Sequence, residues 1–480
     1  MSAKLANSVS LGTGHHEDID MRLSIDRFIR HKQALALALL LPASMAHADT
    51  WFPRNGGAAG SAGDHLGSSI AMSTTGIGGP TAEAANRVYV GLPYASDGTL
   101  AECGSVQVYV RDPASSYGWK YSATLYAKVR QAGAHFGASL AADSQHLIVG
   151  APDFDANGGA IADAGRIEFY QVYGQDTPLN IIYGGGIGEF ESGANFGNAL
   201  AVQGGKLAVA KVHSQNGNGC VLGYIFNTTS QQWELPPGIS TYACGSTGAE
   251  LGASVAIQST GTSSFLLVAG APGETQNGNL LAGAAHVLFP NPNAATGQDW
   301  LEVGTLAADN PGAFEFFGTS VGIDNSFVYV GATGRDNGVG RVGSVTIFKP
   351  ASIIGYDYLS EYFPGAPATI GGHCGASLSV DAKNSQFIVG CPDSDGVQSK
   401  EGNARLYKMF TFLGQPVWLE SLLGYGNTFH SGGDSLGASV ALFDKEAFVG
   451  APNFHFSGQS GNGTWKAFLP DKIFADGFGP

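Results

Sequence analysis

Residues 136–152 read FGASLAADSQHLIVGAP, which is a small-residue cassette, a short polar turn and an apolar run ending in Gly-Ala-Pro. Variants of this unit recur along the chain, with the cassette starting at Leu66, Phe136, Phe196, Leu251, Phe317, Cys374 and Leu436, each followed by glycine. A third segment alternates, as in RIEFYQ (166–171), and a fourth often carries a tryptophan: Trp119, Trp233, Trp300 and Trp418. Four short segments that repeat about every sixty residues predict a radially repeated all-β fold.

The repeats predict a seven-bladed β-propeller built of four-stranded antiparallel blades. Small side chains place the Gly/Ala/Ser strand innermost, where strands converge, and the proline of Gly-Ala-Pro belongs at a strand end because it cannot donate to a ladder. The last blade supplies only three strands, 437–442, 446–451 and 464–469. We therefore expect an N-terminal strand that carries Trp51 to complete it and remove an exposed edge.

These repeats resemble the FG-GAP repeats of integrin-α-like β-propellers, in the compact bacterial exported form of that family. The resemblance spans residues 50–470 and implies the propeller fold, with ligands bound on one face. Two departures matter. Val209-Ala210-Lys211-Val212 replaces Gly-Ala-Pro in blade 3, so an irregular strand end is expected there. The hairpin at Ala142-Asp143-Ser144-Gln145-His146 is too short and too poor in carboxylates for the calcium loops of integrin α-subunits.

The N-terminal sequence and the net charge limit where the protein is expected to be located and which partners it is expected to bind. Arg22, Arg27, Arg30 and Lys32 precede an apolar run, Ala34 to Leu41, and then Ala46-His47-Ala48, which together predict a signal peptide over 21–48. Residues 1–20 are interpreted as a mis-called start, 49–470 as the propeller and 471–480 as a C-terminal tail. The protein is expected to be exported, to the periplasm, the cell surface or beyond. A net charge of −15 argues against nucleic acid, and no membrane span is expected, nor an oligomer.

Five cysteines in an exported protein predict disulfides. Cys374 takes the place of Phe in the cassette and Cys391 that of Ala in Gly-Ala-Pro, positions that face each other in the inner hairpin of blade 6. Cys220 begins the third strand of blade 3 and Cys244 follows its fourth, which predicts a second bridge. Cys103 is left over and is expected to be a buried small residue.

Catalytic motifs find no support in the sequence. Gly318-Thr319-Ser320-Val321-Gly322 fits the nucleophile elbow, but that motif needs a helix after the serine, and Ser320 aligns with the serines of other inner strands. His135 and His373 flank cassettes without an obvious carboxylate partner. Calcium is the one cofactor that the sequence suggests, through Asp153, Asp155, Asn157 and Asp163, although the bidentate ligand of a calcium loop is missing and ordinary turn chemistry is the competing explanation.

Strand order brings the loops 153–163, 273–282, 333–341 and 393–403 to one rim with the linkers 127–135, 307–316 and 424–435. Binding residues concentrate on loops held by a rigid scaffold, so Asp336, Asp393 and Asp395 are candidate rim residues. The sequence favours a non-catalytic module that binds a protein or glycan, for example in adhesion. A hydrolase or lyase with its site in the axial funnel, and a purely structural envelope component, remain as alternatives. An apolar or aromatic patch on the rim would favour the binding module.

Overall fold

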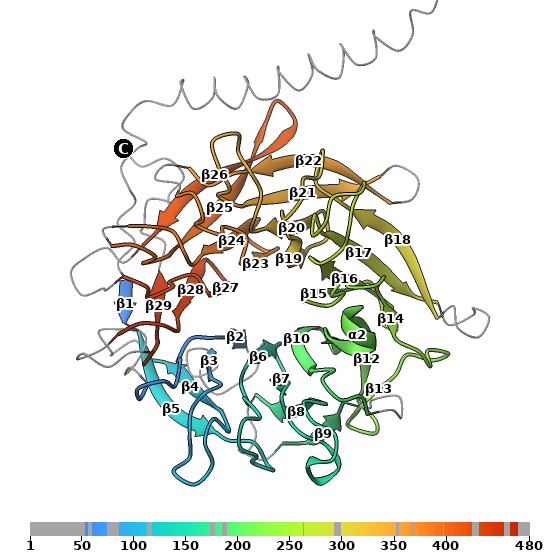
Figure 1. Ribbon diagram of the computed structural model, residues 1–480, viewed down its shortest axis with the longest axis vertical. Helices are drawn as coiled ribbons and strands as arrows, with labels where there is room; N and C mark the ends of the chain where they lie inside the picture. The colour runs from blue at the N-terminus through green and yellow to red at the C-terminus, as the bar shows by residue number, and fades with distance from the viewer. Residues whose placement is uncertain are drawn as a thin grey trace, which may run out of the picture. The chain divides into compact units, whose positions relative to one another are not determined.

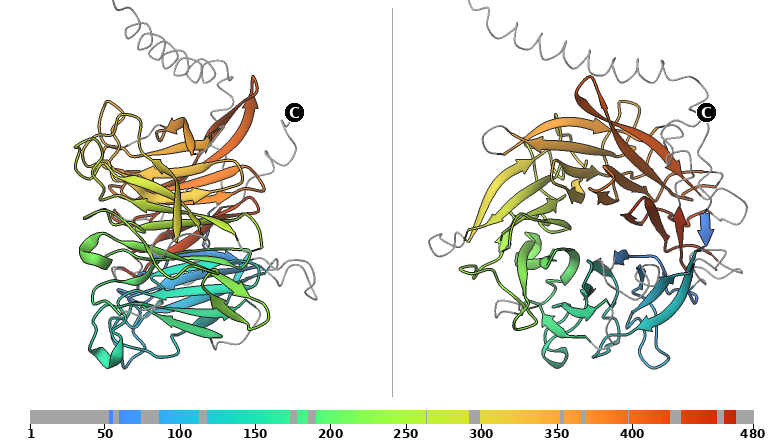
Figure 2. Two further views of the ribbon diagram at one scale, coloured as in Figure 1. Left: turned by 90° about the vertical axis from the view of Figure 1, so that its right-hand side faces the viewer. Right: turned by 180° about the vertical axis from the view of Figure 1, so that it is seen from behind.

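The computed structural model describes residues 53–55, 60–73, 86–112, 118–172, 178–184, 190–262, 264–291, 299–351, 355–365, 369–396, 398–424, 432–455 and 461–468. All of them lie in one compact unit, Thr50–Pro480. Seven antiparallel sheets stand around a central axis, and the chain passes from one sheet to the next in sequence order (Figure 1). Figure 2 shows the same arrangement from the side and from behind. The predicted all-β seven-bladed propeller is confirmed.

The first three blades follow the predicted segments closely. Blade 1 consists of β2 (Ile70–Ser73), β3 (Arg87–Leu92), β4 (Ser105–Arg111) and β5 (Trp119–Leu125). Blade 2 consists of β6 (Ser139–Ala142), β7 (His146–Ala151), β8 (Arg166–Gln171) and β9 (Asn180–Tyr183), with the 3-10 turn η2 (Asn157–Gly159). Blade 3 consists of β10 (Phe196–Gln203), β11 (Lys206–Lys211), β12 (Cys220–Asn227), β13 (Gln232–Glu234) and β14 (Ala243–Cys244), with the short helix α2 (Ser214–Gly217).

The remaining blades repeat the pattern. Blade 4 consists of β15 (Ser254–Ser259), β16 (Phe265–Ala271), β17 (Ala284–Pro290) and β18 (Trp300–Leu306). Blade 5 consists of β19 (Phe317–Ile323), β20 (Val328–Ala332), β21 (Ser344–Pro350) and β22 (Tyr356–Tyr362). Blade 6 consists of β23 (Ser377–Asp381), β24 (Gln386–Cys391), β25 (Asn403–Phe412) and β26 (Gln415–Leu423). Blade 7 contains β27 (Ser439–Phe443), β28 (Glu446–Ala451) and β29 (Thr464–Phe468).

A short strand, β1 (Pro53–Asn55), pairs antiparallel with β29, and Pro53 lies opposite Phe468. Trp51, the residue expected on this strand, lies outside the described residues, so its placement stays a prediction. The ring is also joined between its first and last blades by a parallel bridge between Leu66 and Gly463. No helix in the described part of the chain has the length and hydrophobicity of a membrane span.

A glycine before each third strand lets neighbouring blades approach closely. Parallel bridges join Gly104 to Phe136, Gly165 to Phe196, Gly283 to Phe317, Gly343 to Cys374 and Gly402 to Leu436. Gly104 has φ +80°, and a Cβ built on it would lie 2.2 Å from the carbonyl oxygen of Phe136. Only glycine fits such a position, because it has no Cβ and accepts a positive φ without strain.

The inner-strand serines form a second set of joints. Each Oγ donates to the carbonyl of the cassette glycine in the next blade, with Ser69 bonding to Gly137, Ser139 to Gly197, Ser254 to Gly318, Ser320 to Gly375, Ser377 to Gly437 and Ser439 to Gly67. Ser320 is thus occupied in a structural bond of 2.7 Å, and β20 rather than a helix follows its strand. The interpretation of Ser320 as a structural residue is supported.

Blade 3 uses a different residue to bond to the cassette glycine of the next blade. Ala199 stands at the serine position, and the Nδ2 of Asn198 reaches the carbonyl of Gly252 at 3.3 Å instead. The irregular strand end expected at Val209–Val212 is not found, because β11 pairs regularly with β12 as far as Lys211. The irregularity is a register shift within β10, between Phe196 and Leu200.

The described core is divided among the interfaces between blades. One cluster, for example, packs Val88, Tyr109 and Trp119 of blade 1 against Phe448 and Trp465 of blade 7. Burying a large apolar side chain stabilises a fold by about 1.5–3 kcal/mol. Because each cluster draws on two blades, an isolated blade would leave its faces exposed, and the ring is the unit of stability.

Both predicted disulfides are present. Cys374 and Cys391 are joined within the inner hairpin of blade 6, and Cys220 is joined to Cys244, which lies directly opposite it across β12 and β14. Cys103 is unbridged and buried, as expected. Burial raises the pKa of its thiol, which disfavours the reactive thiolate.

Candidate functional site: the loop rim

One face of the ring carries the loops between second and third strands and the linkers that lead to the next blade. We call this face the loop rim. The residue just before each cassette has a positive φ: His65, His135, Asn195, Glu250, Phe316, His373 and Ser435, with values between 50° and 59°. Glycine would adopt this conformation more easily, and positive φ is uncommon for other residues. The chain therefore keeps seven side chains at strained positions beside the innermost strands.

The backbone of these residues fastens each blade to the one before it. The N–H of Asn195 donates to the carbonyl of Asp163 at 2.9 Å, and that of Phe316 donates to the carbonyl of Leu281 at 3.0 Å. His65 makes the same bond to Gly461 at 2.9 Å. The left-handed conformation is thus part of the joint between blades, and it holds the side chains in fixed directions.

Three neighbouring blades bring three of these side chains into one continuous row with three others from the loops between second and third strands. We call it the polar arc, and it consists of His65, Tyr94, His135, Asp153, Asn195 and His213. The Tyr94 ring lies 5.0 Å from the His65 ring and 4.6 Å from the His135 ring, between centroids. His135 Nδ1 lies 2.5 Å from Asp153 Oδ2, and Asn195 Nδ2 donates to Asp153 Oδ1 at 2.6 Å. Asn195 Oδ1 lies 2.7 Å from His213 Nδ1.

The polar arc corrects one expectation from the sequence. His135 has a carboxylate partner in Asp153, and His373 in blade 6 has one in Asp393, with 2.6 Å between Nδ1 and Oδ2. The hydrogen bond to Asp153 raises the pKa of His135; burial opposes this, and Glu102, 3.5 Å away, adds to it. His135 is therefore a cation held between two carboxylates over a wider pH range than a free histidine.

The predicted calcium ligands have other partners. Asp153 holds His135 and Asn195, and Asp155 Oδ1 accepts from the N–H of Asp163 at 3.0 Å. Asn157 begins the exposed turn η2. Across the described residues, no three His, Cys, Asp or Glu side chains gather in a way that could hold a metal ion. A cation at this loop stays a prediction, and turn chemistry accounts for the bonds seen.

The predicted rim residues occupy exposed loops of blades 5 and 6. Asp393 lies beside His373 and 3.8 Å from Lys400 Nζ, and Asp395 accepts from the N–H of Lys400 at 2.8 Å. Asp336 caps its own turn by accepting from the N–H of Gly338 at 2.7 Å. All three carboxylates therefore order the loops in which they lie, and the structure does not bring them together into one site.

Blades 4 to 6 present a different surface, which sequence reasoning missed. We call it the apolar patch, and it consists of Leu280, Phe314, Val339 and Ile370, with exposed fractions of 61%, 46%, 82% and 64%. The N–H of Phe314 donates to the carbonyl of Leu280 at 2.9 Å. The Ile370 side chain packs against Gly340, which adjoins Val339. Arg341 links the two pairs, because it donates to the carbonyl of Phe314 and accepts from the N–H of Gly371, which follows Ile370, at 2.7 Å in each case.

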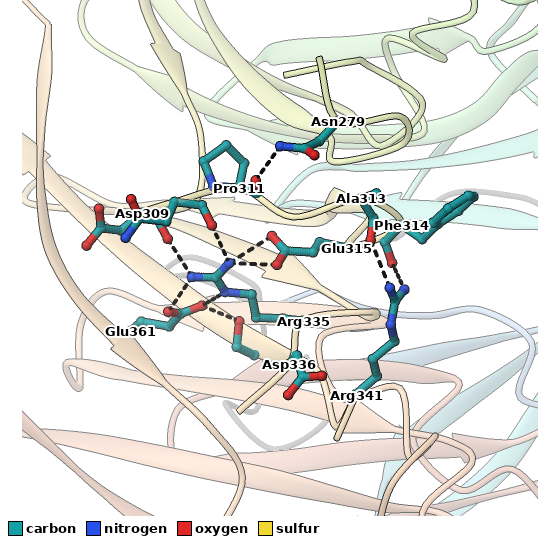
Figure 3. A network of polar contacts seen from close by, with 12 residues as sticks. Asn279, Asp309, Pro311, Ala313, Phe314, Glu315, Arg335, Asp336, Arg341 and Glu361 are labelled. Carbon is teal, nitrogen blue, oxygen red and sulfur yellow. Dashed lines mark hydrogen bonds and ion pairs between the residues drawn. The ribbon is translucent and has the colours of Figure 1, made fainter. Parts of the chain in front are cut away.

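Arginines tie this patch to the ring (Figure 3). Arg341 donates to the carbonyls of Phe314 and Ala313, at 2.7 and 2.9 Å. In the same loop, Arg335 donates to both oxygens of Glu315 at 2.8 Å and to Glu361 Oε1 at 2.8 Å (Figure 3). Arg335 also reaches the carbonyls of Asp309 and Asn310. One guanidinium thus joins a loop, a linker and the outer strand β22, and these contacts raise the pKa of Arg335 against the opposing effect of burial.

Other blades use the same device with different residues. Arg166 pairs with Glu168 at 2.9 Å in blade 2, both fully buried, and Arg405 pairs with Glu420 at 2.7 Å in blade 6. In blade 4, His286 lies between Glu274, at 2.7 Å, and Glu302, at 3.0 Å. Separating a buried pair leaves an uncompensated charge and is strongly destabilising. Movements that would separate these charges are therefore disfavoured, and the elements that carry them are held in position.

Comparison with known proteins agrees with this architecture. The FG-GAP repeat family matches residues 300–348, which span the last strand of blade 4 and the first strands of blade 5. The protein is a seven-bladed β-propeller with an FG-GAP repeat. No curated protein matches this FG-GAP propeller. A solved structure of U3-55K is similar to it, with a TM-score of 0.47 and 12% identity over 87% of this chain and 98% of that one.

The FG-GAP propeller therefore carries its two candidate surfaces on one face. The polar arc lies beside the inner strands of blades 1 to 3, and the apolar patch lies on the loops of blades 4 to 6. His65 and His135 were visible in the sequence because each precedes a cassette, whereas His213 and the patch residues follow no motif.

Proposed function

We propose that this propeller is a non-catalytic binding module that engages a protein ligand through the loop rim. The observation that carries the proposal is the apolar patch. Exposed apolar side chains are normally scattered singly, whereas contiguous ones bordered by polar residues mark interaction sites. Phe314 and Arg341 also belong to the residue types enriched at protein interfaces.

The contacts of Arg335, which hold the loops of the apolar patch, also favour a binding function. Arg335 fixes the linker that carries Phe314 and the loop that carries Val339, so little conformational freedom remains to be lost when a partner docks. Rigid presentation of a surface increases affinity by lowering that entropic term. An enzyme in the axial funnel would instead need free polar groups on the inner strands, and the inner-strand serines described above are engaged in joints between blades.

Affinity capture from the host cell envelope, followed by calorimetric titration of the captured protein, tests the proposal. The informative variant is Val339→Asp combined with Ile370→Asp, and Leu413→Asp is its control. Leu413 is 84% exposed, close to the 82% of Val339, but lies at the β25–β26 hairpin on the opposite face. We expect the double variant to weaken binding by about tenfold or more, as for loss of central interface contacts. Equal binding by both variants would refute the assignment of the patch.

A further inference from the structure

We propose that the polar arc of blades 1 to 3 is a second site on the rim, one that binds a saccharide without acidic groups. The inference rests on the proposed function in taking the rim as a binding face, but it uses different blades and different residues. It begins from Tyr94, which is 42% exposed although it contacts two histidine rings. An exposed ring held in place by two neighbouring rings offers a fixed aromatic surface to the C–H groups of a sugar ring, because aromatic side chains combine large contact area with restricted motion.

Polar groups adjoin the aromatic surface at fixed positions. Asp153 is oriented by two bonds, from Asn195 and with His135, and a carboxylate oxygen keeps further acceptor capacity after accepting one hydrogen bond. Asn195 is in turn bonded to His213, which is exposed. The row therefore presents acceptors and donors side by side, the arrangement that adjacent hydroxyl groups of a sugar can satisfy together.

The arc is preorganised by the fold. His65, His135 and Asn195 have positive φ, and the N–H of each bonds to the loop of the preceding blade. Their directions are therefore set before any ligand arrives, which limits the entropy lost on binding.

Local charge selects the class of saccharide. Asp153, Asp155 and Asp163 lie together in this loop, where burial and the charges of the first two raise the pKa of Asp163 against the opposing charge of His135. Glu102 adds another carboxylate beside His135. Uronic acids, sulfated sugars and phosphates would be repelled here, whereas neutral sugars and amino sugars would not.

The test is calorimetric titration of the full chain with five hexasaccharides: cellohexaose, mannohexaose, chitohexaose, glucosamine hexamer and oligogalacturonate. At least one of the first four should bind with a dissociation constant below about 1 mM, and oligogalacturonate should bind most weakly. Tyr94→Ala and Asp153→Asn should each lower the affinity about tenfold, while Tyr94→Phe retains it. Tyr121→Ala is the matched control, since Tyr121 is 50% exposed on the outer strand β5.

Three results would overturn the inference: no binding by any neutral or amino saccharide, tightest binding by oligogalacturonate, or equal losses in Tyr94→Ala and Tyr121→Ala. The two proposals fail separately. If saccharides do not bind but the Val339→Asp and Ile370→Asp variant still loses its protein partner, only the saccharide site is wrong. If Tyr94→Ala abolishes saccharide binding while the patch variant behaves as wild type, only the protein-binding surface is wrong.

Discussion

The joint between blades 1 and 2 gives the sharpest quantitative test of the ring. A Cβ at Gly104 would lie 2.2 to 2.8 Å from the O, N and C atoms of Phe136, closer than real Cβ contacts come. Gly98, in the same blade, has a similar φ of +87°, but a Cβ there meets nothing within 4 Å. Gly104→Ala and Gly98→Ala therefore share the backbone strain and differ only in the contact with the next blade.

The two effects can be separated numerically. Placing alanine in the left-handed region costs about 1–2 kcal/mol, partly offset by about 0.4–1 kcal/mol from the stiffer unfolded chain. We therefore expect Gly98→Ala to destabilise the protein by about 1 kcal/mol. Gly104→Ala must also move the blades apart by about 1 Å, which weakens the bond from the Phe136 N–H to Cys103 at 3.2 Å and disturbs a fully buried phenylalanine. These losses add about 2–4 kcal/mol.

Thermal unfolding followed by tryptophan fluorescence measures the difference. For a unit of this size, 1 kcal/mol corresponds to roughly 1 °C in the melting temperature. Gly104→Ala should therefore melt about 3–5 °C below wild type, and Gly98→Ala about 1 °C below it. Equal shifts in the two variants would show that the blades part freely at this joint, and the account of Gly104 as a contact glycine would be wrong.

Three further outcomes follow from the rim. Arg335→Met should lower the melting temperature by the equivalent of about 3–5 kcal/mol, because it leaves the buried Glu315 and the partly buried Glu361 without their cation, and replacing both by glutamine in the same chain should restore part of the loss. Burial opposes the charge of His286, but its two glutamate partners outweigh burial and raise its pKa above the ordinary 6.5. Protonated His286 therefore stabilises the fold fully below pH 6.5, and this stabilisation is lost as the pH rises through the raised pKa. His286→Gln should remove this part of the pH dependence of the melting temperature above pH 6.5. Melting should be indifferent to EDTA and to added Ca²⁺; a calcium-dependent rise that Asp155→Asn removes would instead establish the cation site.

The fold was predictable because its constraints recur in the sequence. A cassette glycine recurs in every blade, and the serine or asparagine of the preceding blade bonds to its carbonyl in each case. Repetition turns such a steric requirement into a visible pattern. The same logic placed Cys374 opposite Cys391, because Phe317 and Ala332 occupy the equivalent paired positions in blade 5.

The site was only partly predictable, because its contacts cross between blades. His135 and Asp153 are 18 residues apart, and Asn195 reaches Asp153 from a linker 42 residues further on. The sequence separation of these residues does not predict the bonds. The bonds form because the antiparallel strands of each blade bring these loops to the same face of the ring. The apolar patch was harder still, since Val339 and Ile370 belong to irregular segments where periodicity carries no information.

Because the same backbone recurs seven times, a comparison of the blades shows which residues the fold requires and which can vary. The cassette glycine is the same in every blade, whereas the residue before the cassette is His, His, Asn, Glu, Phe, His or Ser in turn, at nearly the same φ. The joint between blades needs the backbone of that residue and is indifferent to its side chain. At such a position the fold does not determine the side chain, and glycine would be less strained there. A side chain that is nevertheless present can differ from blade to blade and is available to contact a ligand. The loop rim meets this condition at all seven of those positions, with polar residues meeting on blades 1 to 3, and blades 4 to 6 add the exposed apolar patch. We therefore propose a different kind of ligand for each of the two surfaces.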